Sequence, residues 1–276
     1  GTIANVIILL GIVPAYGDCE FKHLVRNELQ VFLSKAKPEK RIVTKEMIQT
    51  LPVVIQKWLL QSGVVGKELI YTVRLKQKGQ MRLKPDGKWM PVEAMEYFTV
   101  DTPGFIWIAN VNAGQLMHLA ARDKYDHGKG QMLIKALSVL PVVKTEGKEI
   151  DQGTLLRYLA EIVWFPSAAL CNYISWEEAG PSSAKATMKY GSIEASGIFT
   201  FNEAGEVIQF EAQRYYQRKE GATLETWIIT TDTTSFKEFD GIRIPAKSSV
   251  TWRLKTGDFT WFNLEVTDVE YNFYNH

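Results

Sequence analysis

The sequence predicts a mainly β member of the α+β class, in which a curved antiparallel sheet, a half-barrel, wraps one buried helix and follows an N-terminal helical lead-in. Two observations predict this class. From about Gly66 onward, apolar and polar residues alternate with period two between turn signals, as they do in half-buried strands. The segment 151–166 interrupts the strands with helical spacing and has almost no polar face, and a helix that is apolar all round is a buried helix.

The first 43 residues are predicted to form the lead-in. Residues 3–15 are almost wholly apolar, which we interpret as the end of a membrane helix that continues upstream of Gly1; an ordinary buried helix or strand is the alternative. Residues 18–37 have helical apolar spacing and a charged opposite face, which predicts an amphipathic helix that Pro38 stops. We therefore expect the protein to be membrane-associated through the upstream segment, on a side that the sequence leaves open.

Residues 44–276 are expected to form a single β-rich domain that encloses the helix at 151–166. Two short helices are predicted within residues 44–63. In the strands that follow, Phe105, Trp107, Ala109 and Val111 share one face because side chains alternate along a strand. Turn residues at 202–205, 240–241 and 256–257 predict hairpins between later strands.

Composition excludes several classes of protein. Lys and Arg (32) nearly balance Asp and Glu (31), so a formal charge of +1 argues against nucleic acid as a main partner. No apolar run reaches the roughly 18 residues that span a bilayer. Cys19 and Cys171 are too few for a disulfide scaffold or a cysteine zinc site. No metal-ligand spacing or phosphate-loop motif is present, and the sequence indicates no cofactor and no metal.

Charged residues in apolar surroundings mark a candidate site. Within the predicted buried helix, Arg157 and Glu161 are four residues apart and close enough to pair. Arg214 lies on the more apolar side of its strand. Arg122 and Asp123 should point to opposite faces of a regular strand, because successive side chains alternate.

Two interpretations of these charges stay open. In the first, a polar cluster inside the concavity meets an anionic headgroup or positions a reacting group; its members are Arg122, Arg157, Glu161 and Arg214. In the second, the same residues form a buried ion-pair network that fixes the helix on the sheet. Eight Trp, eleven Tyr and thirteen Phe either fill the core or line a cavity for an apolar ligand. His118, with apolar neighbours, is better explained as a core histidine than as a base or metal ligand.

Motifs at residues 51–66, 122–132 and 157–168 and at Arg214-Tyr215 are distinctive. They resemble a widespread bacterial family that is catalogued as a domain of unknown function, and the similarity extends over roughly residues 44–274. The family supplies no catalytic residues. It implies hydrophobic helices ahead of the domain in longer members, and the pattern is also similar to the half-barrel of bacterial lipoprotein carriers, which hold acyl chains in an apolar concavity. The candidate ligand-binding residues or buried polar cluster are Arg122, Asp123, Tyr125, Arg157, Glu161, Trp164, Arg214 and Tyr215.

The leading functional hypothesis is a non-enzymatic module, displayed at a membrane, that binds a lipid or another amphiphile between the curved sheet and the helix. The rival hypothesis is a hydrolase-type enzyme that uses Asp123, Glu161 or His118 as acid or base beside the arginines. A third hypothesis is a structural or protein-interaction domain.

Overall fold

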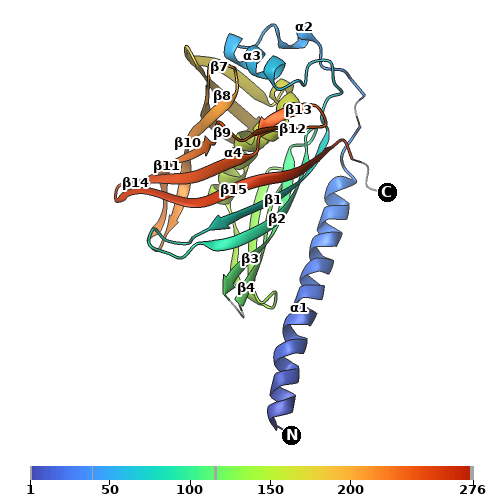
Figure 1. The fold of residues 1–276 in the computed structure, drawn as a ribbon, viewed down its shortest axis with the longest axis vertical. Helices are drawn as coiled ribbons and strands as arrows, with labels where there is room; N and C mark the ends of the chain where they lie inside the picture. Colours follow the sequence, from blue (N-terminus) through green and yellow to red (C-terminus); the bar gives the residue numbers. More distant parts are fainter. Residues whose placement is uncertain (1, 39, 115–116, 274–276) are drawn as a thin grey trace.

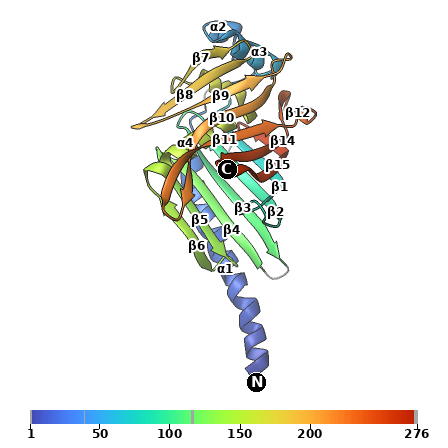
Figure 2. The same cartoon turned by 90° about the vertical axis from the view of Figure 1, so that its left-hand side faces the viewer.

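A curled antiparallel sheet forms the body of the protein. The computed structural model describes residues 2–38, 40–114 and 117–273, with side chains from Ala15 onward. The sheet has 13 strands in the order β6-β5-β4-β3-β2-β1-β15-β14-β11-β10-β9-β8-β7. The strands are β1 (Thr72–Met81), β2 (Met90–Thr99), β3 (Gly104–Gly114), β4 (Met117–Asp126), β5 (Lys129–Ala136), β6 (Leu140–Glu146), β7 (Ile174–Gly180), β8 (Ser183–Tyr190), β9 (Ile193–Phe201), β10 (Val207–Arg218), β11 (Gly221–Thr231), β14 (Lys247–Leu254) and β15 (Gly257–Tyr271). The predicted mainly β half-barrel is confirmed (Figures 1 and 2).

The predicted hairpins are present. Asp240 (φ 49°) and Gly241 (φ 72°) form the tight turn of a separate small hairpin, β12 (Phe236–Phe239) and β13 (Ile242–Pro245). Two successive positive φ angles favour an Asp-Gly pair because glycine adopts them without strain. Pairing of β1 with β15 joins the two halves of the large sheet, and a bulge between Lys76 and Gln77 interrupts that ladder. Such irregularities bend a strand and increase its twist, which suits a curled sheet.

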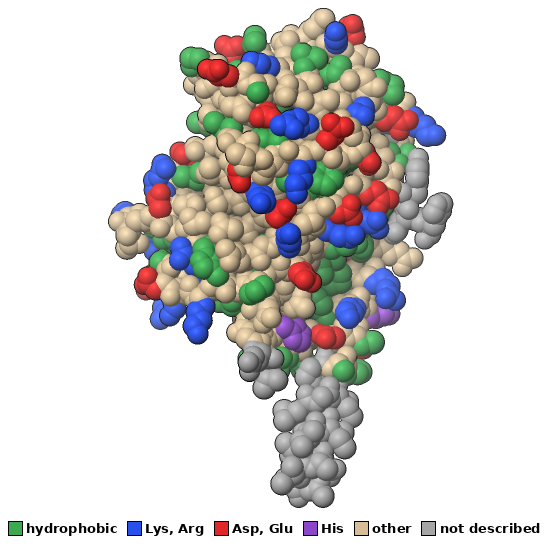
Figure 3. Space-filling model, viewed as in Figure 1, with side chains coloured by type: hydrophobic (Ala, Val, Ile, Leu, Met, Phe, Trp, Pro, Cys, Tyr) green, Lys and Arg blue, Asp and Glu red, His purple; other side chains and the backbone are tan. Residues whose placement is uncertain are grey.

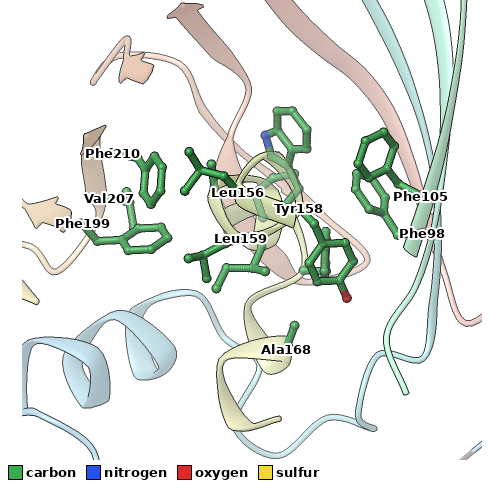
Figure 4. Packing of buried hydrophobic residues seen from close by; sticks show 14 of the residues in the cluster. Phe98, Phe105, Leu156, Tyr158, Leu159, Ala168, Phe199, Val207 and Phe210 are labelled. Carbon is green, nitrogen blue, oxygen red and sulfur yellow. The ribbon is translucent and has the colours of Figure 1, made fainter. Parts of the chain in front are cut away.

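One helix crosses the concave face of the sheet. Helix α4 (Lys148–Glu161) lies in the chain between the two edge strands, β6 and β7, and nine of its 14 residues are buried. Figure 4 shows Leu156, Tyr158 and Leu159 of α4 between Phe199 and Phe210 on one side and Phe98 and Phe105 on the other. The prediction that the sheet encloses this apolar helix is confirmed.

The predicted boundaries of this helix are wrong at both ends. The α-helix begins three residues before Asp151 and ends at Glu161, and two 3-10 segments follow, Ile162–Trp164 and Pro166–Leu170. Phe165, between them, is non-helical (φ −141°, ψ 69°). The residue before a proline is pushed out of the α region by contact with the proline ring, so the helical run breaks there.

The N-terminal segment forms one helix rather than two parts. Helix α1 (Thr2–Leu33) runs through both the apolar run and the amphipathic segment, and it ends five residues before Pro38. Phe21 and Val25 pack on Ala120 and Leu133, and Phe32 packs near Ile106. These sheet residues alternate with the core-facing ones, so α1 covers the convex face of β3–β5, behind which it passes in Figure 2. Within the described residues, no helix is both long enough and apolar enough to cross a membrane.

Two further α-helices lie beside β7 and β8, at the edge of the sheet opposite β6. The two predicted short helices are α2 (Lys45–Ile48) and α3 (Val53–Gln61), which lie near the ends of β7 and β8 (Figure 1). Trp58 of α3 packs edge-on against Trp176 of β7. On the face drawn in Figure 3, Lys and Arg side chains are interspersed with Asp and Glu. That face therefore has no extended basic surface of the kind that binds nucleic acid.

Candidate functional site

A large cavity lies between α4 and the concave face of the sheet. Its volume is about 860 Å³, and its wall is formed by α4 together with strands from both halves of the sheet. The wall is mostly apolar, with a concentration of aromatic rings that includes Trp227, Trp252, Phe259 and Trp261, and Ile134 and Val143 line the other side. Ligand pockets are commonly about 300–1,000 Å³ and largely apolar with a few placed polar groups, so this cavity has the size and lining of a binding site.

Arg157 is the centre of a charged network on the α4 side of the cavity. Its Nη2 donates to Oε1 of Glu96 (2.7 Å) and its Nη1 donates to Oδ2 of Asp123 (3.0 Å). Its Nε donates to Oε1 of Glu161 (2.8 Å), one turn further along α4. The guanidinium also lies over the rings of Phe105 and Trp107, 4.7 and 5.2 Å from their centroids. Arg157 thus fixes α4 to β2 and β4 at a single point.

Burial governs the protonation of this network. It raises the pKa of Glu96 well above its usual range, Glu161 adds to the rise by repulsion, and Arg157 opposes it. Burial also raises the pKa of Asp123 and of Glu161, again against the attraction of Arg157. Burial lowers the pKa of Arg157, but the attraction of the three carboxylates outweighs it and leaves that pKa above its usual value. The arginine stays charged, whereas Glu96, which is fully buried, is the carboxyl group most readily protonated.

Arg214, on β10, lies on the same wall but outside this network. Its guanidinium lies over the rings of Trp227 and Trp252, 4.6 and 5.9 Å from their centroids. A Cβ built on Gly153 of α4 would be 3.4 Å from the Arg214 Nε, so the side chain also lies against the helix. Burial and repulsion by Arg157 lower the pKa of Arg214 to about 10, which leaves it charged at neutral pH.

Arg122 does not join the cluster inside the concavity, contrary to the interpretation that included it. It lies on the convex face, where its Nε is 3.0 Å from Oε2 of Glu28 on α1. Its neighbour Asp123 points into the concavity, as the alternation of side chains predicts. Asp123 takes the place that the sequence interpretation gave to Arg122.

His118 is on the convex face as well. Its Nε2 lies 3.2 Å from Oδ1 of Asp18 on α1 and 3.1 Å from Oγ of Ser138. It is therefore a half-buried partner of α1 rather than a histidine of the main core. His118 therefore cannot serve as the acid or base of the hydrolase hypothesis, because it does not converge with Asp123 and Glu161 on one cleft.

The aromatic candidates have different surroundings. Tyr125 is fully buried against Phe105 (ring centroids 6.4 Å apart) and does not line the cavity. Trp164 and Tyr215 both line it. The Trp164 carbonyl oxygen accepts a hydrogen bond from the Tyr271 hydroxyl (2.7 Å), which fixes the backbone just after α4.

Sequence reasoning missed Glu96 and Gln77. Gln77 donates from Nε2 to Oε2 of Glu96 (3.1 Å) and accepts from the Trp107 indole (2.8 Å), so it joins the network to the cavity wall. The signal for Glu96 was present, because this residue shares strand parity with Val92 and Phe98 on the apolar side of β2. That is the same pattern that singled out Arg214.

The chemistry available at the wall follows from these contacts. Asp123 and Glu161 both accept from Arg157, which holds the two carboxylates in place, and Oε2 of Glu161 is buried without a hydrogen-bond partner in the described part of the chain. Within residues 2–38, 40–114 and 117–273, no group of acidic, histidine or cysteine side chains has the arrangement of a metal site. The arrangement is suited to holding an apolar molecule beside a charged wall.

The chain belongs to the Family of unknown function (DUF6544), whose model matches residues 41–264. No curated protein matches the chain. Among solved structures, one described as an outer membrane lipoprotein-sorting protein domain from Vibrio parahaemolyticus is similar, at 8% identity and a TM-score of 0.39, over 81% of this chain and 92% of that one. A DUF1329 family protein from Desulfovibrio piger is similar at 11% identity and a TM-score of 0.37, over 82% of this chain and 96% of that one.

Proposed function

We propose that this family member is a non-enzymatic binding module that holds an apolar or amphiphilic, lipid-like ligand between the curved sheet and α4. The observation that carries the proposal is the cavity of about 860 Å³, whose wall is mostly apolar and rich in aromatic side chains. A cavity of this size lined by apolar groups favours a ligand that removes apolar surface from water. Hydrogen bonds from Arg157 to Glu96 and Asp123 fix α4, one wall of the cavity, to strands β2 and β4.

Blocking the cavity tests the proposal. Val143 on β6 lines the cavity, whereas the neighbouring Val142 points away and is 50% exposed. We expect Val143→Trp to weaken binding of a long-chain apolar probe at least tenfold, because the indole occupies ligand volume. Val142→Trp is the matched control and should bind as the unchanged protein does. Isothermal titration calorimetry with hexadecanol, kept below its solubility limit, gives the Kd for all three proteins.

Native mass spectrometry of protein incubated with a lipid extract gives an independent measurement. We expect retained lipid on the unchanged protein and on Val142→Trp, and little on Val143→Trp. Absence of any retained lipid, together with absence of hexadecanol binding, would overturn the proposal. Equal binding by both tryptophan variants would place the ligand outside the cavity.

We further propose that the protein associates with a membrane through its N-terminal segment. The support is the sequence of residues 3–14, in which Asn5 is the only polar side chain. We expect the chain to float with phosphatidylcholine vesicles in a density gradient, and Ile8→Asp with Ile12→Asp to abolish flotation because burying a carboxylate in lipid is costly. Flotation of the doubly substituted chain at the original level would contradict the proposal.

A further inference from the structure

The arginines of the cavity wall differ in whether their hydrogen-bonding groups are used. Arg157 donates to three carboxylates, and Arg82 donates from Nε to the Thr260 carbonyl (2.7 Å) and also to the Pro85 carbonyl. Arg214, the third arginine on this wall, makes no hydrogen bond or ion pair with any residue in the described part of the chain. A guanidinium has five N–H donors in one plane, so Arg214 has donors to offer to a ligand.

The surroundings of Arg214 hold it in place without using those donors. Contacts with the ring faces of Trp227 and Trp252 attract the cation but consume no N–H group. The Nε of Arg214 also lies beside α4, 3.4 Å from the position that a Cβ on Gly153 would take. Arg214 is half-buried at the cavity, where water can reach its N–H groups. A ligand that displaces this water without supplying an acceptor would leave a charged group unpaired, which is costly, so an acceptor on the ligand is favoured.

We propose that Arg214 binds the polar head of the ligand, and that the ligand is an amphiphile with an acidic head, a carboxylate or a phosphate monoester. This proposal rests on the proposed function, because it assigns the head of the same ligand whose apolar part fills the cavity. The planar fork of a guanidinium matches the two oxygens of a carboxylate or phosphate by paired N–H···O bonds. The aromatic wall beside Arg214, formed by Trp227 and Trp252, receives the adjoining apolar chain.

Two acidic side chains close to Arg214 affect how it can bind an anionic head. Asp123 and Glu161 attract Arg214, as their upward effect on its pKa indicates, but their hydrogen bonds are made with Arg157. They also repel an incoming anion. The preference for an acidic head therefore comes from the paired hydrogen bonds at short range rather than from a positive field over the cavity, and it requires the fork geometry of arginine.

The test compares heads on one tail. Hexadecanoate, hexadecyl phosphate, methyl hexadecanoate and hexadecanol are titrated below their aggregation limits, with inorganic phosphate as the tail-free anion. We expect the unchanged protein to bind the two acidic probes about tenfold to a hundredfold more tightly than the ester and alcohol, as hydrogen bonds between charged groups imply. Inorganic phosphate should bind far more weakly than hexadecyl phosphate.

Variants then assign the preference to one residue. Arg214→Met should remove the preference for acidic heads and leave the Kd of the ester within about threefold, and Arg214→Lys should restore only part of it because an ammonium lacks the fork. Arg253→Met is the matched control, since Arg253 is 55% exposed at its side chain and does not line the cavity. Melting curves show whether each variant is folded.

The outcomes separate the two proposals. Equal binding of acid, ester and alcohol by the unchanged protein overturns the role of Arg214 and leaves the binding module standing, and this arm needs no variant to fold. Equal weakening of acid and ester by Arg214→Met also overturns it. Equal affinity for inorganic phosphate and hexadecyl phosphate overturns the assignment to an amphiphile. Absence of binding by every tailed probe overturns the proposed function and, with it, this inference.

Discussion

Arg157 shows how a single residue can decide whether a helix inside a sheet is held in one position. Each of its three bonded carboxylates comes from a different element, β2, β4 and α4 itself. Removing the guanidinium would leave the buried Glu96 and Glu161 and the half-buried Asp123 without their cation, and loss of one partner of a buried pair costs about 3–5 kcal/mol. The network therefore acts as an anchor for α4, which is the structural alternative that the sequence left open.

The buried position of Glu96 predicts how stability depends on pH. Its pKa is raised well above the usual 4.5 in the folded protein, so the folded state holds this proton more tightly than the unfolded chain does. As pH rises above 4.5, the unfolded state loses the proton first, and the contribution of Glu96 to stability falls until the folded-state pKa is passed. The free energy of unfolding of Glu96→Gln, minus that of the unchanged protein, should therefore increase as the pH rises above 4.5.

Urea unfolding at several pH values measures this difference. Glu265→Gln is the control, and its stability difference should change with pH in the opposite direction. The reason is that hydrogen bonds from Lys237 and then Lys78 lower the pKa of Glu265 in the folded protein. The stability that Glu265 contributes is present above its usual pKa and is lost on acidification, so the difference for its variant should decrease as pH rises. A pH-independent difference for Glu96→Gln would show that Glu96 is not perturbed.

At the scale of the element, the sequence predicted that a helix exists near α4 and that it is buried, but it did not predict where this helix begins and ends. Its lack of a polar face identified it as an enclosed helix, because exposed helices keep one polar side. The break after Glu161 was not predicted because Pro166 acts through the residue before it, and the last turns tighten to 3-10 geometry. The contact between α4 and β5 was not predicted either, because it depends on a single glycine, and one glycine in a strand gives no periodic signal in the sequence.

That glycine, Gly130, allows β5 to approach α4. A Cβ at this position would lie 2.6 Å from the Ile150 carbonyl oxygen and 2.4 Å from Oγ1 of Thr154, and its backbone N–H donates to Oδ1 of Asp151 (2.7 Å). We expect Gly130→Ala to displace α4 and to destabilise the protein by about 1–3 kcal/mol, the usual cost of overpacking. Urea unfolding monitored by tryptophan fluorescence measures the change.

Gly153→Ala is the matched control for this contact. Gly153 belongs to α4, and a Cβ built on it would lie at an ordinary contact distance of 3.4 Å from the Arg214 Nε. Alanine in a helix interior is favoured over glycine by roughly 0.5–1 kcal/mol, so this variant should be as stable as the unchanged protein or more so. If both substitutions cost the same, close packing at Gly130 is not what holds α4 to β5.

At the scale of the whole molecule, the sheet uses its two faces differently: the concave face forms the cavity and the convex face carries α1. Alternation along β4 predicted that Arg122 and Asp123 point to opposite faces, but not which face is concave. The apolar stripe of α1 predicted burial without identifying its partner. The pairing of β1 with β15, such as Leu75 with Val269, joins residues almost 200 positions apart, and no local pattern specifies it.

This separation of faces predicts that α1 is dispensable for ligand binding. Phe21 and Val25 are its buried contacts with the convex side of β4 and β5, so Phe21→Asp with Val25→Asp should release the helix at the cost of burying carboxylates. We expect faster proteolysis within residues 15–33 and a Kd for hexadecanol within about threefold of the original, because the cavity lies across the sheet. His23→Asp with Asn27→Asp, on the exposed side of the same helix, should change neither measurement. If releasing α1 weakens ligand binding as much as Val143→Trp does, the two faces are coupled through the sheet, and the cavity cannot be treated as an independent site.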